Sequence, residues 1–149
     1  MDLTLKTKIV SYSDTTENNF AIDLWKITKN KFKIKVIDSK YSNVDYELTS
    51  KTSGKKLYLE LKCRDFKYSN CDSFIIGKTK IDGIASKQLL PCILVWKFNT
   101  LIYYKKYTTD LLNYKTSLIQ NSSVIHINKN ECNDGMETLV ELIEELVEN

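Results

Sequence analysis

The sequence predicts an α/β domain with a mixed central β-sheet flanked by helices. Segments of alternating apolar and polar residues at 32–37, 43–48 and 57–63 indicate half-buried strands. A nearly continuous apolar run at 92–98 is typical of a central strand buried on both faces. Apolar residues at helical spacing near both ends of the chain predict the flanking helices. The 149 residues are enough for one ordinary domain and too few for two, so a single domain is expected over 1–149.

The first half of the chain predicts one helix and three strands. A helix is expected over 17–28, where apolar residues recur at helical spacing after two threonines that can cap it. A strand with lysines on its polar face follows at 32–37. The polar run 49–56 joins the next two alternating segments as a hairpin connection, so these strands should lie side by side.

The second half predicts two more helices and three strands. Pro91 precedes the apolar strand, and the strand after it is expected to be its hairpin partner. In chain order, an irregular polar segment, a helix, two strands, a short strand and a closing amphipathic helix are predicted at 64–72, 73–88, 92–98, 101–107, 124–127 and 136–147.

The charge distribution is uneven along the chain. The net charge of +3 is small, but basic residues concentrate between Lys26 and Lys106, whereas residues 131–148 are strongly acidic. A basic body with an acidic last helix fits a nucleic-acid binder whose last helix faces elsewhere. A solvated surface of mixed charge is the alternative explanation.

Several classes of protein are disfavoured by what the sequence contains. The four cysteines form no Cys-x-x-Cys pair and His126 is the only histidine, which disfavours zinc ribbons, disulfide-stapled domains and Ser-His-Asp catalysis. Gly77-Lys78-Thr79 lacks the upstream glycine of a phosphate-binding loop, so no nucleotide cofactor is expected. No apolar run approaches the roughly 20 residues of a membrane span, and no signal peptide is evident, so an intracellular location without membrane contact is expected.

The strand at 57–63 carries charged side chains within an apolar run. Because strand side chains alternate between faces, Tyr58, Glu60 and Lys62 share one face, and their neighbours Leu59 and Leu61 share the other. The predicted hairpin brings Asp45 beside Glu60 and Lys62. Carboxylates that can hold a hard cation, with a positive group beside them, are what phosphodiester cleavage requires.

Asp45 followed by Glu60-Leu61-Lys62 on the next strand resembles the PD-(D/E)xK, or restriction-endonuclease-like, nuclease superfamily. Val44 stands where that superfamily commonly has proline before the aspartate. The order of predicted elements over roughly residues 15–107 is similar to the αβββαβ core of the superfamily. The resemblance implies hydrolysis of DNA phosphodiester bonds that leaves a 5′-phosphate.

The resemblance also implies roles for individual residues. Asp45, Glu60 and the main-chain carbonyl of Leu61 would hold Mg²⁺ or Mn²⁺, and Lys62 would orient or help to deprotonate water. Glu17 would add a metal-facing carboxylate from the first helix, as in resolvase-like members, although Asp14 competes for that role. Glu47 is the alternative to Asp45, and an exposed cross-strand ion pair is the alternative explanation of Glu60 and Lys62.

Basic residues after the motif are candidates for contact with DNA. These are Arg64, Lys78 and Lys80, of which the two lysines lie on the predicted helix at 73–88, and a solvated helix face is the competing explanation. Tyr103, Tyr104 and Tyr107 are interleaved with Lys105 and Lys106, as aromatic and basic residues are in single-strand binders, but a structural role in a strand is favoured.

The sequence therefore predicts a divalent-metal-dependent endodeoxyribonuclease. Within that superfamily, the small size and the helical glutamate look most like Holliday junction resolvases, and this resemblance implies action on branched DNA as a homodimer. Resolvases of this type are often encoded by phages, in which case the protein would work in the host cytoplasm. The alternatives are a sequence-specific restriction or repair endonuclease, and a non-catalytic DNA-binding or interaction module with the same fold.

Overall fold

A computed structural model of the protein describes residues 12–37, 42–63, 72–98 and 101–148, with the side chains of residues 12–18 outside this description. The elements follow one another as α1 (Tyr12–Ile27), β1 (Phe32–Val36), β2 (Tyr46–Ser50), β3 (Lys56–Cys63), β4 (Ser73–Gly77), α2 (Lys78–Ser86), β5 (Cys92–Lys97), β6 (Ile102–Lys106), the 3₁₀ helix η2 (Thr109–Asn113), β7 (Thr116–Ile119), β8 (Ser122–Asn128), the 3₁₀ helix η3 (Lys129–Glu131), β9 (Asn133–Asp134) and α3 (Met136–Glu148).

A mixed six-stranded sheet forms the centre of the molecule, with the strand order β1-β2-β3-β5-β6-β9. Strand β3 pairs in parallel with β5, with Glu60 opposite Leu94, and the other neighbouring strands pair antiparallel. Two parallel strands need a crossover connection, and α2 lies in the segment that joins β3 to β5. The predicted hairpins between β2 and β3 and between β5 and β6 are confirmed.

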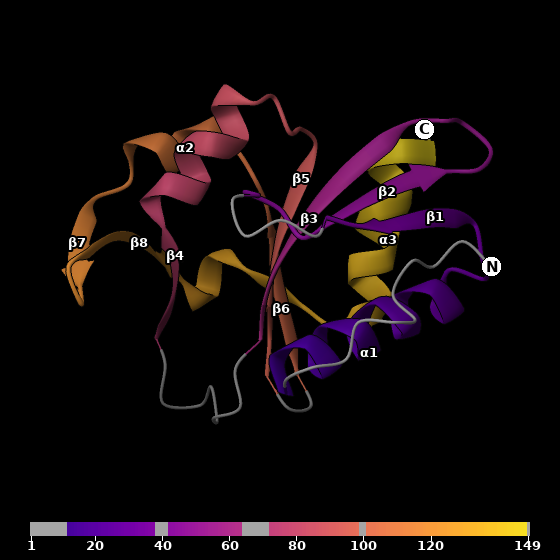
Figure 1. Ribbon diagram of the computed structural model, residues 1–149, viewed down its shortest axis with the longest axis horizontal. Helices are drawn as coiled ribbons and strands as arrows, with labels where there is room; N and C mark the ends of the chain where they lie inside the picture. Colours follow the sequence, from indigo (N-terminus) through magenta and orange to yellow (C-terminus); the bar gives the residue numbers. More distant parts are fainter. Residues whose placement is uncertain (1–11, 38–41, 64–71, 99–100, 149) are drawn as a thin grey trace.

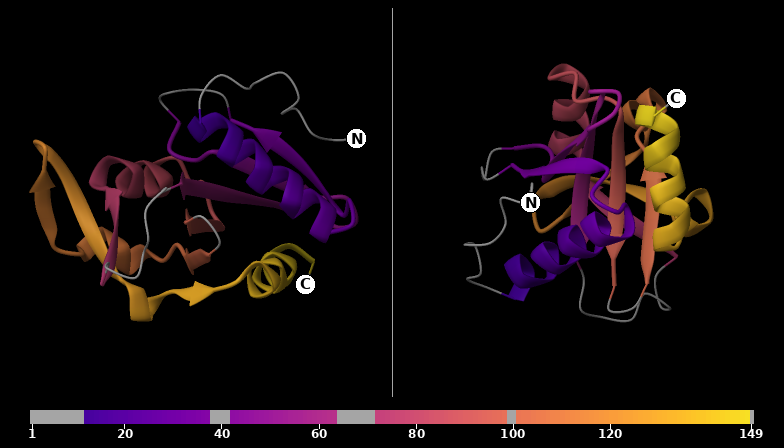
Figure 2. Two further views of the ribbon diagram at one scale, coloured as in Figure 1. Left: turned by 90° about the horizontal axis from the view of Figure 1, so that it is seen from below. Right: turned by 90° about the vertical axis from the view of Figure 1, so that its right-hand side faces the viewer.

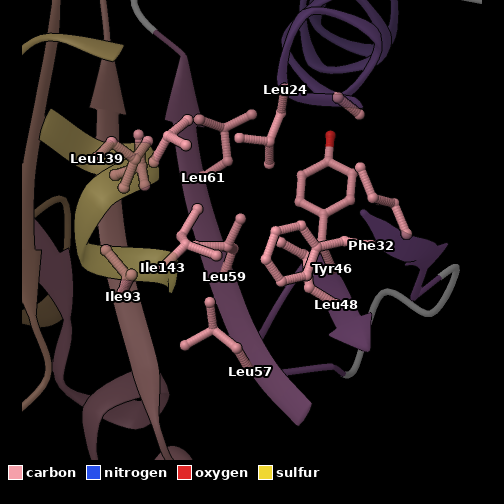
Figure 3. Close-up of a cluster of buried hydrophobic side chains, with 14 of the residues drawn as sticks. Leu24, Phe32, Tyr46, Leu48, Leu57, Leu59, Leu61, Ile93, Leu139 and Ile143 are labelled. Carbon is pink, nitrogen blue, oxygen red and sulfur yellow. The ribbon is translucent and has the colours of Figure 1, made fainter. Parts of the chain in front are cut away.

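One face of the central sheet is covered by α1 and α3. Leu57, Leu59 and Leu61 project from β3 toward Leu24 of α1 and toward Leu139 and Ile143 of α3, as Figure 3 shows. These side chains are between 0% and 3% exposed. Burial of a leucine or isoleucine side chain contributes about 1.5–3 kcal/mol, so this alternate set of β3 residues fixes the strand in the sheet.

The acidic last helix, α3, lies on the same face of the central sheet as α1. Glu148 accepts hydrogen bonds from the hydroxyl groups of Ser50 and Thr52, and Ser53 Oγ donates to the Val147 carbonyl at 2.5 Å. These bonds hold the end of α3 against the β2–β3 turn. The acidic helix therefore lies on one face of the central sheet, and α2 lies on the other.

The other face of the central sheet is covered by α2 and by a second sheet with the order β4-β8-β7 (Figures 1 and 2). Phe74 of β4 lies against Trp96 of β5 with ring centroids 5.3 Å apart. Trp96 Nε1 also donates a hydrogen bond to the carbonyl of Ile75 at 3.2 Å. The charged residues of β3 face this second layer.

The predicted fold class is confirmed, and most elements agree with the sequence. The apolar run at 92–98 is β5, the central strand, and residues Cys92 to Trp96 are all buried. Tyr103, Tyr104 and Tyr107 are buried in the two hydrophobic clusters, which agrees with their structural role. His126 is an exposed side chain on β8, whose ring nitrogens face the hydroxyl groups of Ser73 and Ser117.

The helix predicted over 73–88 is wrong in its first part. Residues 73–77 form β4, and only Lys78–Ser86 are helical. Phe74 and Ile76 are buried with Ile125 and Ile127 of β8. Aromatic and β-branched residues favour strands, and pairing with β8 stabilises residues 73–77 as a strand. The 3₁₀ helices and strands β7 and β9 were not predicted either, because short polar segments carry little periodicity.

Among the described residues, no helix is both long and apolar enough to cross a membrane. The irregular segment predicted at 64–72 lies outside the described residues, apart from Asp72.

Candidate active site

The charged residues of β3 lie at the centre of the sheet, on the face covered by α2. Tyr58 packs with the hydrophobic cluster on this face, whereas Leu59 and Leu61 belong to the cluster under α1 and α3. The predicted division of β3 into an apolar face and a charged face is therefore confirmed. It places Glu60 and Lys62 between the central sheet and α2.

Asp45 lies directly before β2, at the end of the β2–β3 ladder. Its amide donates a hydrogen bond to the Leu59 carbonyl at 2.8 Å, and its own carbonyl accepts one from Ile37 at 2.8 Å. Continuing the register of Tyr46 with Leu59 sets Asp45 opposite Glu60. The carboxylate of Asp45 accepts a hydrogen bond from the amide of Leu61 at 2.7 Å.

Glu47, the alternative to Asp45, lies farther along the same strand pair. It is opposite Tyr58, and its carboxylate is 3.4 Å from Lys56 Nζ. The structure therefore brings Asp45 to Glu60 and leaves Glu47 in a partly exposed ion pair.

Glu60 is a buried acid, with a side chain that is 1% exposed. Its Oε2 atom lies 3.4 Å from Lys62 Nζ and forms a second ion pair with Lys80 of α2. Neither carboxylate oxygen has a hydrogen-bond partner of ordinary geometry in the described part of the chain. Burial raises the pKa of Glu60 to about 8, and the adjacent Asp45 carboxyl adds to the rise because a proton is favoured between the two acids; Lys62 and Lys80 oppose it.

The two lysines respond differently to the same surroundings. Burial lowers the pKa of Lys62, and its attraction to Glu60 offsets this only in part. Burial also works against the charge of Lys80, but Glu60 outweighs it, so the pKa of Lys80 is raised. Lys62 is therefore the easier of the two ammonium groups to deprotonate.

The Leu61 carbonyl is directed to the same edge of β3 as Asp45. The Leu59 carbonyl accepts from the Asp45 amide at this edge, and the backbone groups of a strand alternate with a period of two residues. Beyond Asp45, strand β2 no longer covers β3. The carbonyl of Leu61 is thus directed to the edge of β3 at which Asp45 lies.

Helix α2 is held against the segment that carries Asp45. Asn43 Nδ2 donates a hydrogen bond to the Thr79 carbonyl at 3.3 Å, and a Cβ atom on Gly83 would overlap the Asn43 amide. Only glycine allows this close approach at position 83. The contact holds the loop before Asp45 and the helix that carries Lys80 together, and no pattern in the sequence predicts it.

The predicted DNA-binding residues have different positions. Lys80 lies in the site, on Glu60. Lys78 is turned away from it: its Nζ is 2.8 Å from the Leu112 carbonyl and 2.9 Å from Asp82. Arg64 lies outside the described residues, and Glu17 and Asp14 lie in the part of α1 whose side chains are not described.

The residues present fit a divalent cation of the Mg²⁺ type. In the described part of the chain no cluster of three or more His, Cys, Asp or Glu side chains exists. Asp45, Glu60 and the Leu61 carbonyl nevertheless offer oxygen atoms only, which Mg²⁺ and Mn²⁺ prefer. Mg²⁺ needs only one or two protein carboxylates, and the buried Oε1 atom of Glu60, which has no hydrogen-bond partner among the described residues, suits such a cation.

Comparison with known proteins supports the fold. No protein-family model and no curated protein sequence matches the chain. Among solved structures, the chain is similar to Hjc, a Holliday junction resolvase from Archaeoglobus fulgidus, with a TM-score of 0.53 and 10% sequence identity. The similarity covers 88% of this chain and 97% of the resolvase chain. The chain thus has a restriction-endonuclease-like fold, as predicted.

The burial of Glu60 predicts a pH-dependent stability of the metal-free protein. Below pH 4.5 the Glu60 carboxyl is protonated in both the folded and the unfolded protein, so it contributes no pH dependence to the free energy of unfolding. Between pH 4.5 and about 8 the unfolded chain loses the proton while the folded protein keeps it, so the free energy of unfolding falls with rising pH. The expected loss is roughly 3–5 kcal/mol over this window.

Urea denaturation in EDTA between pH 5 and 8 measures this loss. Glu60→Gln should remove most of the slope, whereas Glu47→Gln, on the neighbouring strand, should leave it unchanged. Equal slopes in wild type and Glu60→Gln would show that Glu60 ionises normally.

The contact between Asn43 and Gly83 predicts a coupled pair of substitutions. In the wild type, Gly83→Ala should lower the free energy of unfolding by about 1–2 kcal/mol, because the added Cβ displaces the Asn43 amide. In an Asn43→Ala background the same change should be neutral or stabilising by up to about 1 kcal/mol, because alanine favours the helix. Urea denaturation of the four proteins gives the coupling energy, and an additive cycle would contradict the contact.

Proposed function

We propose that the protein is a divalent-metal-dependent endodeoxyribonuclease that selects branched DNA in the manner of a Holliday junction resolvase. The observation that carries the proposal is that Asp45 and Lys62 both lie beside the buried carboxylate of Glu60. This arrangement occurs in a chain whose fold is similar to that of a Holliday junction resolvase. In the alternative explanation, an exposed ion pair, Glu60 would be solvated and its pKa would be close to the ordinary value. The burial of Glu60 and its raised pKa disfavour that alternative.

Asp45, Glu60 and the Leu61 carbonyl are the groups that would hold Mg²⁺ or Mn²⁺. A bound cation of this kind supplies a Lewis acid that stabilises the charge developing on the phosphoryl oxygens. The Leu61 amide fixes one oxygen of Asp45, and the strand fixes Glu60, so these donors are oriented before a cation arrives.

Lys62 is the group that would handle the proton of the attacking water. Its Nζ lies at the edge of the site, with 25% of its side chain exposed, while Glu60 holds it from the buried side. The lowered pKa brings its neutral form closer to physiological pH, which allows it to accept a proton. In its charged form it would also orient the water or a phosphate oxygen.

Selection of branched DNA and action as a homodimer belong to the same proposal. A four-way junction has two symmetric strands to cut, and a two-fold dimer supplies one site for each. The acidic helix α3 lies on the opposite sheet face from α2, which leaves the lysine-bearing side of the site to a polyanion. The proposal also places the protein in the compartment that holds its DNA substrate.

Cleavage of end-labelled DNA tests the proposal. Four-way junction, flap, duplex and single-stranded DNA are incubated with Mg²⁺ or Mn²⁺ and with wild type, Glu60→Ala or Lys62→Met. Symmetric, metal-dependent cuts near the junction are expected, and both substitutions should lower the rate by about 100-fold or more. Lys56→Met is the matched control for Lys62, because Lys56 lies on the same face of β3 but contacts Glu47, and its rate should stay within about twofold of wild type.

The other outcomes have distinct meanings. Cleavage of plain duplex at defined sequences would replace the resolvase by a restriction-type enzyme. Binding of DNA without cleavage by the wild type, with either metal, would identify a non-catalytic module. A strict monomer on junction DNA would contradict paired cutting.

A further inference from the structure

We propose that the ammonium group of Lys80 occupies one side of the Glu60 carboxyl group in the metal-free protein, and that it competes with the divalent cation for this position. The inference rests on the proposed function, because it assigns a role at the same site. It makes Lys80 a positioning residue that controls metal occupancy, in addition to the contact with DNA that the sequence predicts.

The first support is the shared position on Glu60. The ammonium groups of Lys62 and Lys80 both approach Oε2, one from the same strand and the other from α2. A divalent cation on this carboxylate would lie beside two positive charges, and like charges repel strongly at such short separation in a poorly solvated site. One of the two ammonium groups has to withdraw.

The second support is the difference in freedom between the partners. Glu60 is 1% exposed and fixed in the central sheet, whereas 28% of the Lys80 side chain is exposed. A long lysine side chain can change rotamer and carry its charge into water, while Glu60 cannot follow. Lys62 is joined to the same strand only two residues away, so it stays near Glu60 wherever its ammonium turns.

The third support is the place of Lys80 in its helix. It lies in the first turn of α2, which contains no acidic residue, and cations are disfavoured at the positive end of the helix dipole. Lys78 shares this disadvantage but has Asp82 and the Leu112 carbonyl as partners. Lys80 instead forms an ion pair with Glu60 across the site, so this helix position is stabilised through the carboxylate.

The contact of Asn43 with Gly83 decides how the exchange can occur. It fixes α2 against the Asp45 segment, so that the helix backbone has no need to move. Departure of Lys80 then becomes a side-chain motion that leaves the donors Asp45 and Glu60 in place.

Metal affinity, measured without DNA and without turnover, tests the inference. Mg²⁺ is titrated by isothermal calorimetry into EDTA-treated wild type, Lys80→Met and Lys78→Met, all in the same buffer at the same pH. Lys80→Met should bind Mg²⁺ about tenfold more tightly than wild type, because the competing charge is gone. Lys78→Met, the matched control on the same helix turn, should stay within about twofold.

Equal or weaker binding by Lys80→Met would overturn the inference while leaving the proposed nuclease intact. Absence of Mg²⁺ binding in all three proteins would overturn the metal site of the proposed function, and the inference with it. Lys80→Gln provides a second polar variant if Lys80→Met does not fold, as judged by its melting curve in EDTA. A larger rise of the melting temperature on adding Mg²⁺ in the Lys80 variant than in wild type is expected from the same argument.

Discussion

The burial of the Glu60 carboxylate is the constraint around which the site is organised. A carboxylate that is withdrawn from water costs several kcal/mol unless charges or a proton compensate it. Here Lys62 and Lys80 supply charge, and the neighbouring Asp45 favours a shared proton. Each of these groups belongs to a different segment. Compensation for the burial of Glu60 therefore requires the start of β2, strand β3 and helix α2 to lie close together.

The same constraint explains why β3 has two unlike faces. The leucines at positions 57, 59 and 61 are packed between α1 and α3, and this apolar packing stabilises a strand that the charged face would destabilise. Cys92 and Leu94, opposite Tyr58 and Glu60 on β5, are fully buried beside the acid. They withhold water, which raises the pKa of Glu60 and strengthens every charge interaction around it.

Much of this arrangement could be predicted from the sequence, because it depends on local alternation. The period of two in residues 57–63 separates Glu60 and Lys62 from the leucines, and the polar run 49–56 brings Asp45 back to them. The approach of Lys80 to Glu60 could not be predicted in the same way. It depends on how closely α2 lies on the sheet, and that distance is set by Gly83 and Asn43, which are 40 residues apart. The strand β4 was missed for a related reason, since its partner β8 lies about 50 residues later.

A site that is costly in the absence of a cation has a consequence for the whole molecule. Residues arranged for tight, preorganised interaction with a positive ion repel one another or lose hydration until that ion is present. The ammonium groups of the two lysines can take the place of the cation, because they offset the negative charge of Glu60 while leaving one of its two oxygen atoms without a partner among the described residues. Lys62 remains near Glu60 in every state, whereas Lys80 is attached to another element and can leave. If the proposed metal site is correct, this arrangement would allow the protein to fold before it binds metal, and the release of one ammonium group would be part of metal binding.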